Sequence, residues 1–128
     1  MYLRFVVYAL DEDSNRRTGV FQEVNRLVNA RELPPFEEQH ARELFDWFDE
    51  NLTKPTRFAA SSRPHAAPRA ISWFKDSATE HIARMYELAS ILDAHGIAVE
   101  VVQTARPGYI VYADEHQIVA EPFADTSH

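Results

Sequence analysis

The sequence predicts an α+β domain in which three helices pack on one face of a mostly antiparallel sheet of four to five strands. Two observations lead to this fold class. Apolar residues recur at helical spacing in three segments between residues 20 and 95, whereas β-branched and aromatic residues gather near residues 2–10, around residue 72 and beyond residue 97. Each segment has one clearly apolar face, so one helical layer on one sheet would bury them all.

The first half of the chain predicts one strand followed by two helices. Residues 2–10 are mainly aromatic and β-branched, which is typical of a buried strand. The spacing of the apolar residues then predicts a helix from about residue 20 to residue 30. Leu33-Pro34-Pro35 ends this helix, and Pro35 fits the first position of the next one. The inward stripe expected for the second helix contains Phe36, His40, Leu44, Phe45, Trp47, Phe48 and Leu52.

The second half predicts a strand, a helix and a sheet meander. Residues 70–75 favour a short strand, with a helix lead-in as the alternative. Ser77 and Glu80 fit a capping box at the start of the third helix, and Gly96 fits its carboxy-terminal cap. The buried face expected for this helix contains Ala78, Ile82, Met85, Leu88, Ala89 and Leu92.

Beyond the third helix, three strand-like runs predict an antiparallel meander that pairs with the first strand. The runs are residues 97–102, 109–112 and 116–119, with turns at Pro107-Gly108 and Asp114-Glu115. We expect Val99 to be a core residue of this meander. A single globular domain is therefore expected over residues 1–123, with residues 124–128 as a frayed tail.

The charges of the chain are strongly segregated. The net charge is −7, yet the stretch from Asn51 to Lys75, here called the basic segment, contains no Asp or Glu. Segregation of this kind bears on partners and not on the fold. We expect the basic segment to bind an anionic ligand or an acidic protein surface, with a merely solvated loop as the alternative and Asp76 as an opposing charge. The predicted binding residues are Lys54, Arg57, Arg63, His65, Arg69, Trp73 and Lys75.

Several classes of site are excluded or disfavoured by composition. The chain has no cysteine, which excludes disulfides, thiolate metal sites and thiol nucleophiles. With three glycines it can form neither a Gly-x-Ser-x-Gly elbow nor a glycine-rich phosphate loop. Glu37 and His40 make one Glu-x-x-His step, but the third helix has no second copy. We therefore predict no metal, no cofactor and no assigned catalytic residue. Separately, His81 lies near the start of the third helix, and we expect its side chain to be exposed.

Two other functions compete with the binding module. A small phosphodiester-processing enzyme could use His65 or His81 as the proton carrier, with Arg69 and Lys75 stabilising charge. The pairs Trp47-Phe48 and Trp73-Phe74 could stack on bases, although core packing is the favoured interpretation. Alternatively, the chain could be an acidic decoy for a basic protein. Its contact residues would be Glu37, Glu38, Glu43, Asp46, Asp49 and Glu50.

Location and relatives are also predicted from the sequence. A pI of about 5.3 argues against bulk nucleic-acid binding, and the absence of a signal segment or a long apolar run favours a cytoplasmic protein away from membranes. The segments 71–75, 81–85, 107–112 and 121–123 resemble a family of small uncharacterised bacterial proteins of about this length. That resemblance implies a bacterial, single-domain protein and assigns no residue a role. The sequence itself predicts no oligomeric state.

Overall fold

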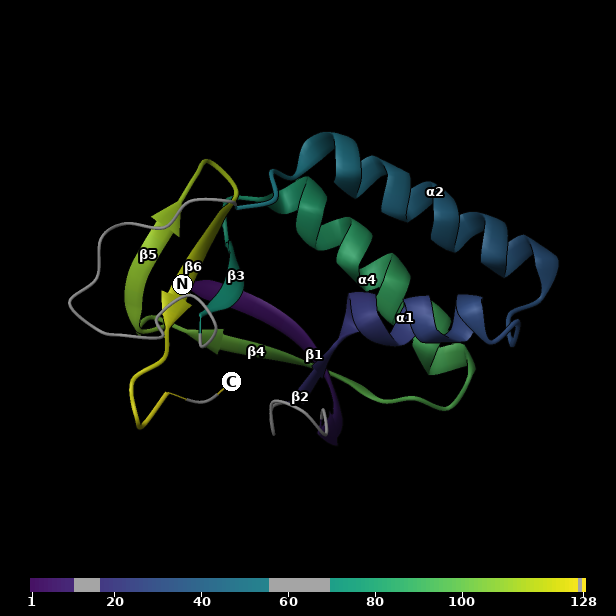
Figure 1. Ribbon diagram of the computed structural model, residues 1–128, viewed down its shortest axis with the longest axis horizontal. Coiled ribbons are helices and arrows are strands. Elements are labelled where there is room, and N and C mark those ends of the chain that lie inside the picture. The colour runs from purple at the N-terminus through teal and green to yellow at the C-terminus, as the bar shows by residue number, and fades with distance from the viewer. Residues whose placement is uncertain (11–16, 56–69, 127) are drawn as a thin grey trace. The chain divides into compact units, whose positions relative to one another are not determined.

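The computed structural model describes residues 1–10, 17–55, 70–126 and 128. These residues form an α+β fold with three helices and an open, mostly antiparallel sheet of six strands, which confirms the predicted fold class with one strand more than expected. The elements, shown in Figure 1, are β1 Tyr2–Leu10, β2 Arg17–Gly19, α1 Val20–Asn29, α2 Pro35–Asn51, β3 Ile71–Lys75, α4 Thr79–Ala94, β4 Val99–Thr104, β5 Tyr109–Ala113 and β6 Gln117–Glu121.

The sheet has the strand order β2-β1-β3-β6-β5, and β4 pairs with β1. The pairing of the first strand with a carboxy-terminal strand was predicted, and so was the β5–β6 hairpin. The prediction of a three-stranded meander is wrong, because β4 pairs with β1 and not with β5. All five residues of β6 are buried, and this strand lies between β5 and β3. Two strand neighbours satisfy the backbone of β6 on both sides.

The chain divides into two compact units. Unit 1 contains Met1–Arg4, Thr53–Ile82 and Val102–His128, and unit 2 contains Phe5–Leu52 and Ala83–Val101. No helix within the described ranges is long and apolar enough to cross a membrane.

Helix α2 buries a narrower stripe in unit 2 than the sequence suggested. Its buried residues are Ala41, Leu44 and Phe48, and the Phe48 ring meets Phe21 edge to face at 4.9 Å. Phe36 was expected in this stripe but is 73% exposed. The reason is helical geometry, since the five residues from Phe36 to Ala41 rotate the direction of the side chain by about 140°. Leu44, Phe48 and Met85 are confirmed as core residues, whereas Ile82 and Val99 are only partly buried.

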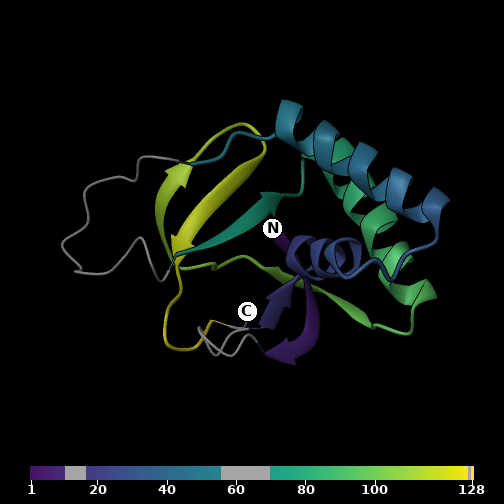
Figure 2. The ribbon, with the colours of Figure 1, turned by 45° about the vertical axis from the view of Figure 1, so that its right-hand side comes forward.

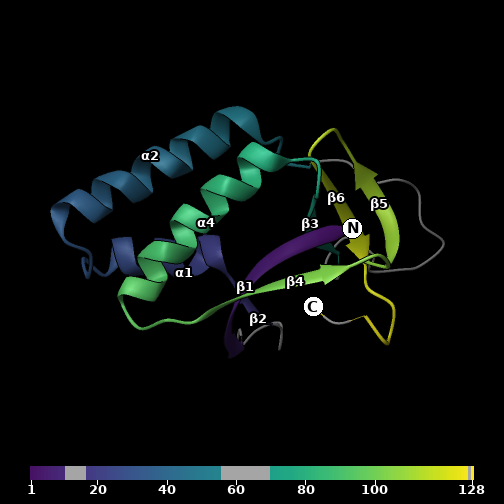
Figure 3. The same ribbon diagram turned by 180° about the vertical axis from the view of Figure 1, so that it is seen from behind.

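Helices α2 and α4 lie side by side and run in opposite directions, as Figure 3 shows from behind. In unit 2, His95 Nε2 lies 2.6 Å from Glu37 Oε2, and His40 Nε2 lies 3.2 Å from Glu87 Oε1. Farther along, the Arg84 guanidinium lies over the Trp47 ring at 4.2 Å. His40, which was expected in the inward stripe of this helix, is half-buried. Polar pairs at the margin therefore join two helices whose apolar residues form the core.

The start of α4 lies one residue later than predicted. The Ile82 N–H donates to the Ala78 carbonyl at 3.0 Å, so Ala78 and not Ser77 occupies the N-cap position. Ala78 is 3% exposed. Burial of this small side chain, together with the turn closed by the Ala78 N–H on the Lys75 carbonyl, sets the helix start in place of the capping box.

Helices α4 and α1 end with the same pattern of backbone hydrogen bonds. At the end of α4, the Gly96 N–H donates to Asp93 O and the Ile97 N–H donates to Leu92 O, both at 3.0 Å. Gly96 has φ +75°, as a Schellman cap requires, which confirms its predicted role. At the end of α1 the corresponding residue is Arg31, with φ +56°. No sequence signal predicted this second left-handed cap.

In unit 1, β3 and the β5–β6 hairpin lie side by side, as Figure 2 shows. Trp73 pairs with Ile118 and is 1% exposed, so it belongs to the core. Just before β5, Gly108 has φ +129°, and a Cβ atom built there would lie 1.9 Å from the carbonyl oxygen of Glu121. Only glycine permits this close approach of the two backbones.

Candidate functional site

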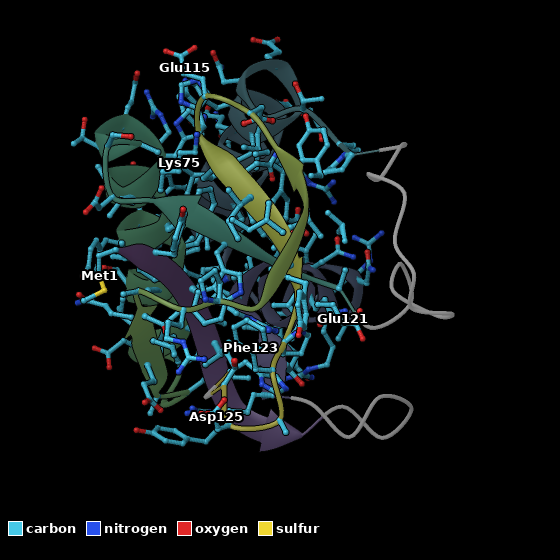
Figure 4. All side chains as sticks on the ribbon, turned by 90° about the vertical axis from the view of Figure 1, so that its left-hand side faces the viewer. Met1, Lys75, Glu115, Glu121, Phe123 and Asp125 are labelled. Carbon is cyan, nitrogen blue, oxygen red and sulfur yellow. The ribbon has the colours of Figure 1, made fainter. Side chains whose placement is uncertain are left out.

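The turn between β5 and β6 positions both described ends of the basic segment. Gln117 Nε2 donates to the Thr53 carbonyl at 2.6 Å, and the Lys75 N–H donates to the His116 carbonyl at 2.9 Å. Lys54 directly follows Thr53. The sequence places Lys54 and Lys75 twenty-one positions apart, yet the fold attaches the backbone near both to one turn of unit 1. Figure 4 shows Lys75 and Glu115 toward the same end of this unit.

Asp114 holds this turn together. Its Oδ1 accepts hydrogen bonds from the backbone N–H groups of His116 and Gln117, and its Oδ2 accepts from Tyr112 Oη and Gln117 Nε2, at distances of 2.8 to 3.1 Å. Burial raises the pKa of the Asp114 carboxyl, but these hydrogen bonds outweigh it and hold the pKa below its ordinary value. The hydrogen bond that the Tyr112 hydroxyl donates to the Asp114 carboxylate raises the pKa of that hydroxyl. Four hydrogen bonds thus converge on one carboxylate, and they favour its ionised form.

Asp76 and Asp114 near this turn are already engaged by other groups, whereas the Glu115 side chain is 87% exposed. Asp76 Oδ2 lies 3.4 Å from the amino-terminal nitrogen of Met1, and Glu115 Oε2 lies 3.8 Å from His116 Nε2. Asp114 is saturated by its hydrogen bonds. Lys75, by contrast, has no ion pair with any residue that the structure describes. The opposing charge expected from Asp76 is thus partly neutralised, and a positive group remains at this end of the strands.

His81 lies inside unit 1 and not on its surface. Its side chain is 4% exposed, and its ring centroid lies 4.2 Å from that of His116 and 6.3 Å from that of Phe74. The expectation that His81 is exposed is wrong. Because α4 begins at Thr79, His81 shares the buried side of the helix with Ala78 and Met85, which stand three residues before and four after it. The histidine pair therefore packs like an aromatic pair.

The predicted binding residues differ in their exposure and in whether the structure describes them. Lys54 is exposed, Lys75 is partly buried, and Trp73 lies in the core. The remaining four, Arg57, Arg63, His65 and Arg69, lie outside the described residues.

Sequence reasoning missed three residues that shape this site, namely Asp114, His116 and Gln117. Asp between two strand-like runs favours a turn in which its side chain accepts from backbone N–H groups just after it, so Asp114 could have been recognised. His116 gave no such signal, because only the fold brings its ring to His81.

Neither a metal centre nor a relative accounts for the site. Among the residues with described positions, no group of three or more His, Asp or Glu side chains could hold a metal ion. No family model, curated protein or solved structure matches the chain. The resemblance to small bacterial proteins stays a prediction, and the function has to be argued from the geometry.

Proposed function

We propose that the protein is a non-enzymatic binding module that engages an anionic ligand or an acidic protein surface through the basic segment. The observation that carries this proposal is the attachment of both ends of that segment, beside Lys54 and Lys75, to the single turn at Asp114–Gln117. The sequence of this segment holds five cations and no carboxylate, and the backbone at both of its described ends is bonded to that turn. Trp73 is buried and contributes by packing β3. Contact with the anionic partner is therefore assigned to the cations of the segment.

The charges around this turn support an anionic partner. Elsewhere among the described residues, some positive charges lie beside carboxylates, as with Arg26 beside Glu23 and Arg42 beside Glu38. Around Lys75, Asp76 and Asp114 are instead paired with the amino terminus or with hydrogen-bond donors. An incoming anion would therefore meet less repulsion here than the net charge of −7 suggests.

The experiment replaces Arg57, Arg63 and Arg69 together with Gln and measures binding of a labelled oligo-glutamate peptide by fluorescence anisotropy. We expect the affinity of this triple variant to fall by about tenfold or more, and the wild-type affinity to fall as salt rises, because exposed charges are screened over about 8 Å at physiological ionic strength. Thermal unfolding of the triple variant is measured alongside, so that a loss of binding is counted only for folded protein.

A control variant with the same net charge carries Gln at Arg26, Arg31 and Arg42, which lie outside the basic segment. It should bind the peptide like the wild type. Equal losses in the two variants would mean that net charge alone governs binding, and the proposal would fall. The same would follow if the basic-segment variant kept full affinity.

An acidic decoy is the second candidate, because one surface of α2 favours it. Glu43, Asp46 and Glu50 are exposed on this helix, and its last turn contains acidic residues but no basic one. Negative charge at a helix carboxy terminus opposes the helix dipole and therefore disfavours the helix. If Gln at these three positions abolishes binding of a native partner recovered from cells, and the basic-segment variant does not, the decoy replaces the binding module.

The enzyme alternative receives less support as far as His81 is concerned. A proton carrier must reach the substrate, and His81 is 4% exposed and stacked on His116. Catalysis by His81 would require this packing to open.

A further inference from the structure

Among the strands that the structure describes, β5 is an edge of the sheet, and its sequence is unusual for an edge. It lies at the end of the strand order, and its sequence, Tyr109 to Ala113, contains no charged residue and no proline. Tyr109 and Ile110 are each 48% exposed. Natural edge strands are commonly protected by charges, by proline or by short length. The opposite edge fits that rule, because β2 has only three residues and includes Arg17.

Opposite charges flank this uncharged strand. Arg106 stands three residues before β5 with its side chain 72% exposed, and Glu115 stands two residues after it with its side chain 87% exposed. Figure 4 is consistent with this separation, since Glu115 lies toward one end of unit 1 and Asp125, the ion-pair partner of Arg106, toward the other. Arg106 therefore lies before the strand and Glu115 after it, with Asp125 near the first and Lys75 toward the same end of unit 1 as the second.

We propose that two copies of this chain associate through β5, with the two strands antiparallel across a two-fold axis. In an antiparallel pair the beginning of one strand lies beside the end of the other. Arg106 of each copy then approaches Glu115 of the second copy, at both ends of the interface. A two-fold contact is self-complementary by symmetry, and a strand with Arg106 before it and Glu115 after it satisfies this requirement with itself. Because successive side chains of a strand point to opposite faces, Tyr109 and Ile110 of the two copies would lie on opposite faces of the joined sheet.

Two features limit the strength of this association. The register of β5 on β6 shifts between Ile110 and Tyr112, and such a bulge twists an edge and shortens the ladder that a second strand can form. Each copy also carries a net charge of −7, so bulk repulsion opposes the dimer. Within one copy, the Arg106 guanidinium already lies 5.1 Å from the centre of the Phe123 ring and 4.0 Å from an Asp125 carboxylate oxygen. The Arg106 and Asp125 side chains are both largely exposed, so Glu115 of a second copy would compete with this ion pair. We therefore expect a weak dimer that depends on concentration and on salt.

The test is a charge reversal measured by sedimentation velocity over a wide range of protein concentration. Arg106→Glu alone and Glu115→Arg alone should each weaken dimerisation by about tenfold or more, because either change places like charges together at both ends of the interface. The double variant, Arg106→Glu with Glu115→Arg, should restore the dimer, since it exchanges the two charges. Ile110→Lys should prevent dimerisation by placing charge in the strand itself.

Control measurements separate this association from folding and from net charge. Glu43 is exposed on α2, away from β5 in the sequence. Glu43→Arg makes the same change in net charge as Glu115→Arg, and it should leave the dimer unchanged. Thermal unfolding of each variant shows whether it is folded. A wild type that is monomeric at every concentration overturns the proposal, and a monomer that binds an extended foreign peptide along β5 would point to a different partner. A dimer that persists in both single reversals, or that the double variant fails to restore, also overturns it.

Discussion

Gly96 and Gly108 have positive φ angles of +75° and +129°, but their surroundings differ completely. A Cβ atom on Gly96, at the end of α4, would meet nothing within 4 Å. The same atom on Gly108, before β5, would lie 1.9 Å from the backbone carbonyl oxygen of Glu121. Gly96 is needed only for its backbone conformation, whereas Gly108 is needed for its conformation and for space. One residue type in a sequence can therefore carry two different energetic roles.

Arg31 extends the comparison to a site without glycine. The Arg31 N–H donates to Val28 O at 3.1 Å and the Glu32 N–H donates to Leu27 O at 3.0 Å, which reproduces the hydrogen bonds at the end of α4. Arg31 adopts φ +56° in spite of its Cβ. The cap at the end of α1 is thus formed against the conformational preference of its residue.

The largest effect is expected for Gly108→Ala. Strain in the backbone and the collision with the Glu121 carbonyl should together lower the free energy of unfolding by about 3 kcal/mol or more. Urea denaturation of the two proteins would measure this loss. A denaturation midpoint close to that of the wild type would show that β5 and β6 can separate at this position, and the contrast with Gly96 would disappear.

A smaller effect is expected at the other end of β5. There the Asp114 side chain holds the turn, whereas at Gly108 it is the lack of a side chain that lets the strands approach. Asp114→Asn should lower the free energy of unfolding at pH 7 by about 1 to 2 kcal/mol, because an ionised acceptor of several hydrogen bonds becomes neutral. The folded state lowers the pKa of this carboxyl, so its stabilisation is present above the unfolded pKa and is lost as pH falls through the folded pKa. The difference between the two proteins should therefore shrink below about pH 4 in urea denaturation at a series of pH values. A difference that is constant with pH would contradict this assignment.

Gly96→Ala should cost less than Gly108→Ala. Only the left-handed conformation is penalised in the open space after α4, at about 1 kcal/mol. The comparison uses the same chemical change, one added methyl group, and the same denaturation measurement. If both alanine variants lose equal stability, the crowding at Gly108 has no energetic consequence.

The smallest effect, with the opposite sign, is expected for Arg31→Gly. Relief of the left-handed strain should exceed the entropy that glycine adds to the unfolded chain, for a net stabilisation of about 0.5 kcal/mol. A shift of the thermal midpoint to higher temperature would show it. Arg31→Ala is the matched control, because it removes the charge but keeps the Cβ atom, and it should bring no such gain.

Local chemistry was sufficient to predict many elements. The aromatic and β-branched run at residues 2–10, Pro35 at the first position of α2, and Gly96 after α4 each act within a few residues. Turn residues likewise predicted the β5–β6 hairpin. Such signals are readable because a strand, a helix end or a tight turn is decided by dihedral preferences and hydrogen bonds between near neighbours.

By itself, then, the sequence determined the α+β class, most element positions and the segregation of positive charge into residues 51–75. Only the tertiary structure decided that β4 pairs with β1, that His81 is buried against His116, and that the backbone beside Lys54 and Lys75 meets at the Asp114 turn. These features join residues distant in the chain. Several pairings satisfy the same local pattern of apolar and polar residues, and the one adopted is selected by the packing and hydrogen bonding of the completed sheet.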